Sequence, residues 1–180
     1  LVRSRGLGDV YKRQLRDAVE ACLASLDADA ARAYRASRAD GSTARMCVVV
    51  QRMVDARAAG VLFTADPVTG RRDRVVVDAI EGLGEALVSG HASPDRFLLD
   101  RSGDVVRAET QTKSPVVSEQ TLRALVTTAV QVADARGMPL DFEWAIDQRG
   151  EIAWLQARPI TTLPSDVREL DSCPDETHVY

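Results

Sequence analysis

The clearest pattern along the chain is a stripe of apolar residues at helical spacing between Ser118 and Gly137. Serine is a preferred residue at the N-cap of a helix and glycine commonly follows the last turn, so these two residues mark the ends. The pattern predicts one amphipathic helix whose apolar face packs on a core. The residues of the stripe are Leu122, Leu125, Val126, Ala129, Val130 and Ala133.

A second helical pattern covers residues 15–37, where Val19, Leu23, Leu26 and other apolar residues recur at three- and four-residue spacing. It predicts two short helices with a break near Asp27.

The two ends of the chain are interpreted differently. We read residues 1–14 as having no helical or strand period and expect them to be foreign read-through sequence, the alternative being a native N-terminal arm. Residues 165–180 are polar and without a period, which indicates a linker that is cut short. One folded region is therefore expected over residues 15–164.

Strand-length apolar runs separated by turn signals fill most of the remaining chain. A turn is predicted at 66–70 (DPVTG), a short helix at 82–89 (GLGEALVS), and hairpin turns at 101–103 and 148–150. Together these elements predict an α+β fold, with a mixed or antiparallel sheet and flanking helices. The predicted strands are residues 46–54, 60–65, 74–79, 96–100, 104–109, 140–147 and 151–157.

Composition excludes several classes of function. Of the 180 residues, 45% are hydrophobic and 28% are charged, which is typical of a folded globular protein. The formal net charge of −4 offers no basic surplus for nucleic acid, and no apolar run is long enough to predict a membrane helix. Cys22, Cys47 and Cys173 have no spacing that indicates a disulfide framework or a zinc site, so we expect a reducing, cytoplasmic setting.

The last predicted hairpin carries the residues with the most chemical promise. Large apolar residues, Phe142 and Trp144 among them, alternate with carboxylates such as Glu143, so one face of the strand is expected in the core. If the turn places Asp147 opposite Gly150, paired residue numbers sum to 297 and Glu143 faces Trp154.

In that register Gln156 lies one diagonal step from Glu143, and Arg158 follows on the same face. A carboxylate and an amide oxygen suit Mg²⁺, which takes only one or two protein ligands beside phosphate and water, and an arginine can grip a phosphate with two hydrogen bonds. The alternative is an ordinary hairpin with a solvated polar face.

Five segments, in order, resemble the ATP-binding domain of phosphoenolpyruvate synthases, an ATP-grasp-type domain shared with rifampicin phosphotransferases and pyruvate phosphate dikinases. The resemblance covers about residues 15–163 and rests on all five segments together. They are Val48–Val54 (VVVQRMV), Gly60–Gly70 (GVLFTADPVTG), Glu81–Glu85 (EGLGE), Phe142–Ala145 (FEWA) and Leu155–Thr162 (LQARPITT).

The resemblance implies roles for four residues. Gln51 would lie at the adenine and ribose side of ATP, although a glutamine on the solvent side of an edge strand explains it too. Glu143 and Gln156 resemble the Mg²⁺·ATP ligands of the family, and Arg158 resembles its phosphate contact and is our candidate catalytic residue. The glycines of the EGLGE segment are interpreted as structural.

The resemblance also implies a multidomain phosphotransferase of which this chain is a part. In a phosphoenolpyruvate synthase, Mg²⁺·ATP phosphorylates a histidine on a mobile domain, which passes the phosphoryl group to pyruvate; the products are phosphoenolpyruvate, AMP and phosphate. An N-terminal lobe, the phosphohistidine domain and the acceptor domain would be its partners. The chain alone is then expected to be inactive. The alternatives are a rifampicin phosphotransferase and a non-catalytic nucleotide-binding module.

Other candidates are given ordinary roles at this stage. Thr64 and Asp66 could line the ATP cleft, but a turn with a capping aspartate explains Asp66 equally well. In the family, the N-terminal lobe carries a lysine that contacts phosphate. Lys113 is expected to be solvated rather than to take the place of that lysine. His91 and His178 are expected at the surface, because neither has the surroundings of a phosphohistidine.

Overall fold

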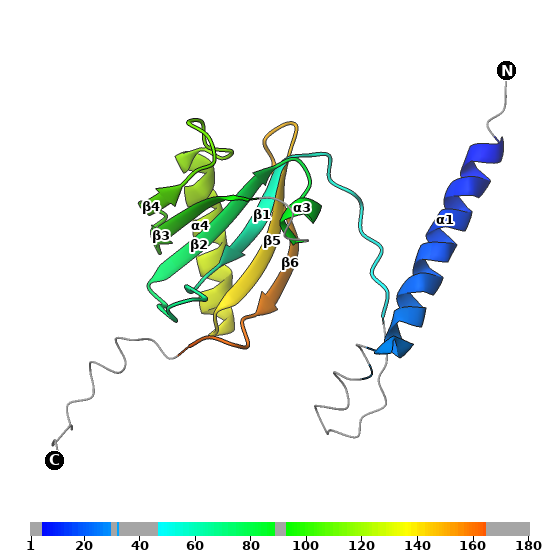
Figure 1. Ribbon diagram of the computed structural model, residues 1–180, viewed down its shortest axis with the longest axis horizontal. Coiled ribbons are helices and arrows are strands. Elements are labelled where there is room, and N and C mark those ends of the chain that lie inside the picture. Colours follow the sequence, from blue (N-terminus) through cyan, green and yellow to red (C-terminus); the bar gives the residue numbers. More distant parts are fainter. Residues whose placement is uncertain (1–4, 30–31, 33–46, 89–92, 165–180) are drawn as a thin grey trace, which may run out of the picture. The chain divides into compact units, whose positions relative to one another are not determined.

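The computed structural model describes residues 5–29, 32, 47–88 and 93–164. The chain divides into two compact units, residues 1–52 and residues 53–180. The second unit holds a six-stranded antiparallel sheet in the order β4-β3-β2-β1-β5-β6, with helix α4 beside it (Figure 1). The predicted α+β class is confirmed, and the sheet is antiparallel rather than mixed.

The elements of this unit follow the predicted order closely. The strand predicted at 60–65 begins four residues earlier and ends at Phe63, while the other predicted strands of this unit lie within one or two residues of their predicted ends. The strands are β1 (Ala56–Phe63), β2 (Arg74–Glu81), β3 (Asp95–Asp100), β4 (Val105–Glu109), β5 (Leu140–Asp147) and β6 (Ile152–Pro159); the helices are α3 (Glu85–Val88) and α4 (Glu119–Arg136).

Helix α4 begins and ends at the predicted residues and covers one face of the sheet. The Ser118 side chain accepts a hydrogen bond from the Thr121 amide, and Gly137 takes the left-handed conformation at φ 65°. The predicted stripe packs on the sheet: five of its six residues are buried, and Val130 is partly buried against the same core. A local 3.6-residue period therefore specified this helix completely.

The core between α4 and the sheet is built from every second residue of the strands. Trp144 of β5 is fully buried at its centre, beside Phe142. Gly60 of β1 makes room for this indole, because a Cβ atom there would lie 2.6 Å from Trp144 Cζ2 and 2.0 Å from the Asp78 carbonyl oxygen. Only a glycine allows the strands and the indole to approach this closely.

The prediction that residues 1–14 have no helical period is wrong. Helix α1 runs as one helix over Arg5–Ala24, so residues 5–14 are helical rather than irregular. The predicted break near Asp27 is present, as a 3-10 helix over Ser25–Asp27, while most of residues 28–37 lie outside the described part of the chain. The physical reason for the error is that the apolar stripe of α1 begins before residue 15.

The predicted strand over residues 46–54 is also not found among its described residues. Residues 47–55 lie in no strand, and Val49 and Met53 are 82% and 79% exposed. An apolar, β-branched run becomes a strand only where another strand offers it hydrogen bonds. Within the described residues of this chain, the run has no such neighbour.

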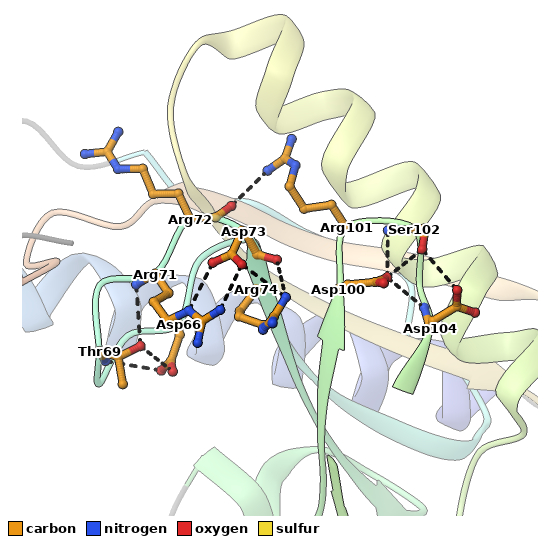
Figure 2. A network of polar contacts seen from close by, with 10 residues as sticks. All are labelled: Asp66, Thr69, Arg71, Arg72, Asp73, Arg74, Asp100, Arg101, Ser102 and Asp104. Carbon is orange, nitrogen blue, oxygen red and sulfur yellow. Dashed lines mark hydrogen bonds and ion pairs between the residues drawn. The ribbon is translucent and has the colours of Figure 1, made fainter. Parts of the chain in front are cut away.

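The predicted turn after β1 is held by its aspartate. The Asp66 carboxylate accepts hydrogen bonds from the Val68 amide at 2.9 Å and from the Thr69 hydroxyl at 2.6 Å. Figure 2 shows Asp66 and Thr69 together at this turn, and Asp100, Ser102 and Asp104 at the turn between β3 and β4. Among the described helices, none is long and apolar enough to span a membrane.

Candidate functional site

The predicted site residues lie on the face of the sheet opposite α4, which we call the site face. Pairing of β1 with β5 places Val61 beside Glu143, and pairing of β5 with β6 places Gln156 on the other side of Glu143. Phe142 and Trp144 point to the core instead, where they are 3% and 0% exposed. The predicted division of β5 into a core face and a polar face is confirmed.

The segment before α3 covers one end of the site face. A Cβ atom on Gly84 would lie 3.5 Å from the Cβ atom of Ala59, which is buried, as is its partner Ala145 on β5. Gly82 enters it with a φ of 76°, a conformation that favours glycine, which supports the structural interpretation of the EGLGE segment. The rows of residues around Glu143 and Asp141 lie beyond this cover.

Glu143 and Gln156 are directly opposite each other on neighbouring strands. Such a pair brings the two Cβ atoms to about 4.5–5.5 Å, so that both side-chain oxygen atoms can reach one ion. Glu143 is half-buried and Gln156 is exposed. Among the described residues no cluster of three or more His, Cys, Asp or Glu side chains could hold a metal, so Glu143 and Gln156 are two oxygen ligands that lie outside any such cluster.

Arg158 follows on the same face and is held by Asp141, a residue that the sequence analysis missed. Its Nε donates a hydrogen bond to Asp141 Oδ2 at 2.8 Å. The Asp141 side chain is only 10% exposed and that of Arg158 is 59% exposed, so a buried carboxylate orients a solvent-facing guanidinium. This hydrogen bond, together with the Asp141 charge, raises the pKa of Arg158.

Asp141 could have been found from the sequence. Alternation in a strand places it on the same face as Glu143, two residues away, so the pattern that identified Glu143 also includes Asp141. The sequence did not identify Arg158 as the partner of Asp141, because that partner depends on the register between the two strands of the hairpin.

The predicted register of this hairpin is wrong, for two reasons. Asp147 lies opposite Glu151 rather than Gly150, because Gly150 takes a positive φ of 90° in a three-residue turn. That turn places Trp154 opposite Trp144, and a further shift between Trp144 and Glu143 then places Gln156 directly opposite Glu143. Glu143 and Gln156 are thus direct neighbours rather than diagonal ones.

Asp147 stabilises the turn that sets this register. Its Oδ1 accepts hydrogen bonds from the amides of Arg149 and Glu151 at 2.8 and 2.9 Å. Backbone hydrogen bonds, that from Glu151 foremost, lower the pKa of Asp147.

Gln51 belongs to the first unit, whereas Glu143, Gln156 and Arg158 belong to the second. Its side chain is exposed and it lies in no strand, so the edge strand that the sequence suggested for it is not found. A role for Gln51 at the nucleotide remains a prediction.

The other candidates from the sequence have structural surroundings or cannot be described. The Thr64 hydroxyl bonds to the amide and carbonyl of Leu140, and Thr64 is 2% exposed, so it joins β1 to the start of β5. Lys113 is exposed, as expected. His91, His178 and Cys173 lie outside the described residues, and Cys22 and Cys47 are exposed, free thiols.

A recess of about 200 Å³ lies farther along the site face, next to the Asp66 turn. Phe63, Val76 and Leu98 from β1, β2 and β3 line it, and Phe63 pairs with Asp141. Arg96 at its edge donates two hydrogen bonds of 2.7 Å to the buried carboxylate of Asp78. This second carboxylate and arginine pair was also missed from the sequence.

Comparison with known proteins gives a consistent family. The chain matches the model of the pyruvate phosphate dikinase AMP/ATP-binding domain over residues 8–115 and 102–175. It is 42% identical over 169 residues to a rifampicin phosphotransferase of Streptomyces sp, covering 81% of this chain and 19% of that protein.

Two further relatives match at similar levels. The prodigiosin synthesizing transferase PigC of Serratia marcescens is 36% identical over 88% of this chain and 20% of its own length. A probable phosphoenolpyruvate synthase of Methanothermobacter thermautotrophicus is 36% identical over 93% of this chain and 27% of its own length. The chain therefore spans about a fifth to a quarter of the relatives it matches.

Proposed function

Because this chain belongs to the family of pyruvate phosphate dikinase AMP/ATP-binding domains, we propose that Glu143, Gln156 and Arg158 form part of a Mg²⁺·ATP site. The observation that carries the proposal is their joint placement on one face: Glu143 opposite Gln156, and Arg158 anchored by Asp141 in the next row. Gln51 would contact the nucleotide on its adenine and ribose side.

Charge on the site face favours a divalent cation. Asp141 and Glu143 carry two negative charges and Arg158 one positive charge, so these residues alone would repel a triphosphate. A Mg²⁺ ion held by Glu143 and Gln156 would reverse that balance, and oxygen ligands of this kind suit it. When bound, the ion would neutralise charge on the phosphates that it bridges.

Arg158 is suited to hold a phosphate in a fixed orientation. The Asp141 carboxylate occupies its Nε, which leaves the N–H groups of Nη1 and Nη2 for an anion. Because the carboxylate is buried, it fixes the guanidinium before a phosphate arrives. A planar donor placed in advance contributes to phosphoryl transfer through positioning and charge, which are the main demands of that reaction.

For the whole protein we propose a phosphotransferase of the phosphoenolpyruvate synthase type. Mg²⁺·ATP would phosphorylate a histidine on a separate domain, which would transfer the phosphoryl group to pyruvate. The N-terminal lobe, the phosphohistidine domain and the acceptor domain would come from the remainder of the polypeptide. Relatives named as rifampicin phosphotransferases support the alternative acceptor, and a non-catalytic nucleotide-binding module is the third candidate.

Binding of Mg²⁺·ATP to the 180-residue chain tests this proposal. NMR titration is the suitable method, because a site without the N-terminal lobe is expected to bind weakly. We expect Glu143→Gln to lower the affinity about tenfold and removal of Mg²⁺ to lower it at least as much. Glu109→Gln is the matched control, since Glu109 lies on β4 at the opposite edge of the sheet. Equal affinities for the parent and Glu143→Gln would refute the proposed site.

A further inference from the structure

Strand β6 changes face in the middle of its length. Trp154 pairs with Trp144, and its ring packs edge-on against Phe142 with the centroids 5.1 Å apart, on the core side. Gln156 pairs with Glu143, on the site face. Residues two apart in a regular strand share a face, so β6 is not regular between Trp154 and Gln156.

The irregularity is a bulge of one residue, Leu155. The register with β5 shifts between Trp144 and Glu143, and Leu155 between Trp154 and Gln156 has no direct partner. A bulge bends its strand and increases the local twist, and bulges beside binding sites redirect side chains. The residues of β6 beyond this bulge, from Gln156 to Pro159, are all exposed.

We infer that the one-residue bulge in β6, rather than any side chain, has a positioning role: it turns the last part of β6 so that Gln156 and Arg158 are directed at Glu143 and Asp141. The inference rests on the proposed Mg²⁺·ATP site. Arg158 is also held by its hydrogen bond to Asp141. Among the described residues, little besides the bulge fixes the direction of Gln156, because β6 is the edge strand and its exposed end pairs only with β5. The twist added by the bulge would bring their polar ends over β5.

The opposite edge of the sheet offers a natural comparison. The β3–β4 turn has the same pattern as the β5–β6 turn: Asp100 bonds to Asp104 as Asp147 does to Glu151, and each turn contains a glycine of positive φ. The register of β4 also shifts by one residue, leaving Val106 without a direct partner. Val106 is thus a bulge residue of an edge strand far from Glu143.

Two variants of Leu155 distinguish the effect of the bulge from the effect of the leucine side chain. Deleting Leu155 makes β6 regular while leaving Gln156 able to pair with Glu143, so the fold and the pairing should persist. We expect Mg²⁺·ATP to bind about tenfold more weakly to this variant in the NMR titration. Leu155→Ala keeps the number of residues and should bind as the parent does.

Deletion of Val106 is the matched control. It removes a bulge residue from the other edge strand. It should therefore change the melting temperature about as much as deletion of Leu155 does, while leaving the Mg²⁺·ATP affinity unchanged. Parent-like affinity after deletion of Leu155 would overturn the inference. So would an equal loss of affinity in the two deletion variants, because that would indicate general destabilisation.

A cross-linking measurement decides the register without ATP. In a chain whose native cysteines are replaced by serine, Glu143→Cys with Gln156→Cys should form a disulfide faster than Glu143→Cys with Leu155→Cys. The reverse order would show an unbulged β6 and overturn the inference, even if deletion of Leu155 prevents folding. If the parent does not bind Mg²⁺·ATP, the proposed function is refuted. The register of β5 and β6 measured by cross-linking would not be affected by that result.

Discussion

Asp141 and Arg158 lie directly opposite each other on β5 and β6, and the Arg158 Nε donates a 2.8 Å hydrogen bond to Asp141 Oδ2. The aspartate is nearly buried and the arginine is half exposed. The buried residue therefore determines where the exposed charge is placed, and the pair stands one row from Glu143 and Gln156.

Asp141→Asn should weaken Mg²⁺·ATP binding about tenfold, because Arg158 loses the charge that orients it. The unfolding free energy should fall by about 1–3 kcal/mol, since a buried acceptor of a charged hydrogen bond is replaced. Titration and chemical denaturation measure the two effects. The control is Asp134→Asn, which removes the exposed partner of Arg101 and should change the affinity and the unfolding free energy little. Unchanged Mg²⁺·ATP binding in Asp141→Asn would contradict the role of Asp141 in orienting Arg158.

Arg158→Lys tests geometry separately from charge. The lysine keeps the positive charge but loses the planar set of donors, so phosphoryl transfer by the full-length protein should slow by about 100-fold. The rate of histidine phosphorylation measures this effect. Arg107→Lys, on the opposite edge strand, should react like the parent, and a near-normal rate for Arg158→Lys would show that the arginine does not hold the phosphate.

Asp66 should make the stability of the sheet depend on pH. Its burial acts to raise its pKa, but hydrogen bonds from Thr69 and Val68 outweigh this effect and lower the pKa below 3.8. A lowered pKa in the folded state adds stability that is present above the unfolded pKa and is lost as pH falls through the folded value.

The unfolding free energies of the parent and of Asp66→Asn, measured by denaturation at several pH values, test this linkage. The advantage of the parent should be constant above about pH 5 and shrink below pH 3.8. An advantage that stays constant down to the lowest pH at which the chain folds would disagree with the lowered pKa.

Gly60→Ala should destabilise the sheet by about 1–3 kcal/mol, because the added Cβ would collide with the Asp78 carbonyl and the Trp144 ring. Thermal unfolding followed by tryptophan fluorescence measures the loss. Gly84→Ala is the matched control, since among the described residues its Cβ would meet only Ala59, at 3.5 Å. Equal midpoints for the two variants would show that the close approach at Gly60 is relieved elsewhere.

Deletion of residues 1–14 should leave unfolding of the sheet unit unchanged, with a midpoint shift below about 2 °C. These residues belong to the first unit, and the buried core of the second begins at Ala58. Thermal unfolding of the chain with and without them gives the answer. A loss of several degrees would show that they contribute to the fold and would argue against foreign read-through sequence.

The elements that the sequence predicted well are those fixed by local patterns. Helix α4 has a capping serine, a 3.6-residue stripe and a terminal glycine, and in β5 every second residue is a large apolar one. Each of these signals acts within a few residues of its own position, so no knowledge of distant contacts is needed.

Elements that depend on a distant partner were predicted less well. The apolar run at 47–54 has strand composition but no neighbouring strand among the described residues. The start of α1 is a different, local error: its apolar four-residue spacing already runs through Leu7, Tyr11 and Leu15, before the predicted start of the helix.

The candidate site shows the same limit. Alternation alone placed Glu143 on a polar face, and the shared face of Glu143, Gln156 and Arg158 was correct. The partner of each residue was not, because the turn at Gly150 and the bulge at Leu155 each shift the register by one. Two single-residue irregularities thus decide which side chains meet, and the bulge at Leu155 has no composition signal.

The most direct test of the proposed site is the map of NMR chemical-shift changes when Mg²⁺·ATP is added to the 180-residue chain. The account predicts chemical-shift changes centred on Asp141, Glu143, Gln156 and Arg158. These changes should depend on Mg²⁺ and should be lost in Glu143→Gln. Residues of the β3–β4 hairpin should remain unchanged. Shifts confined to another surface, such as the recess beside Asp66, or changes at β5 and β6 that persist in Glu143→Gln, would contradict it.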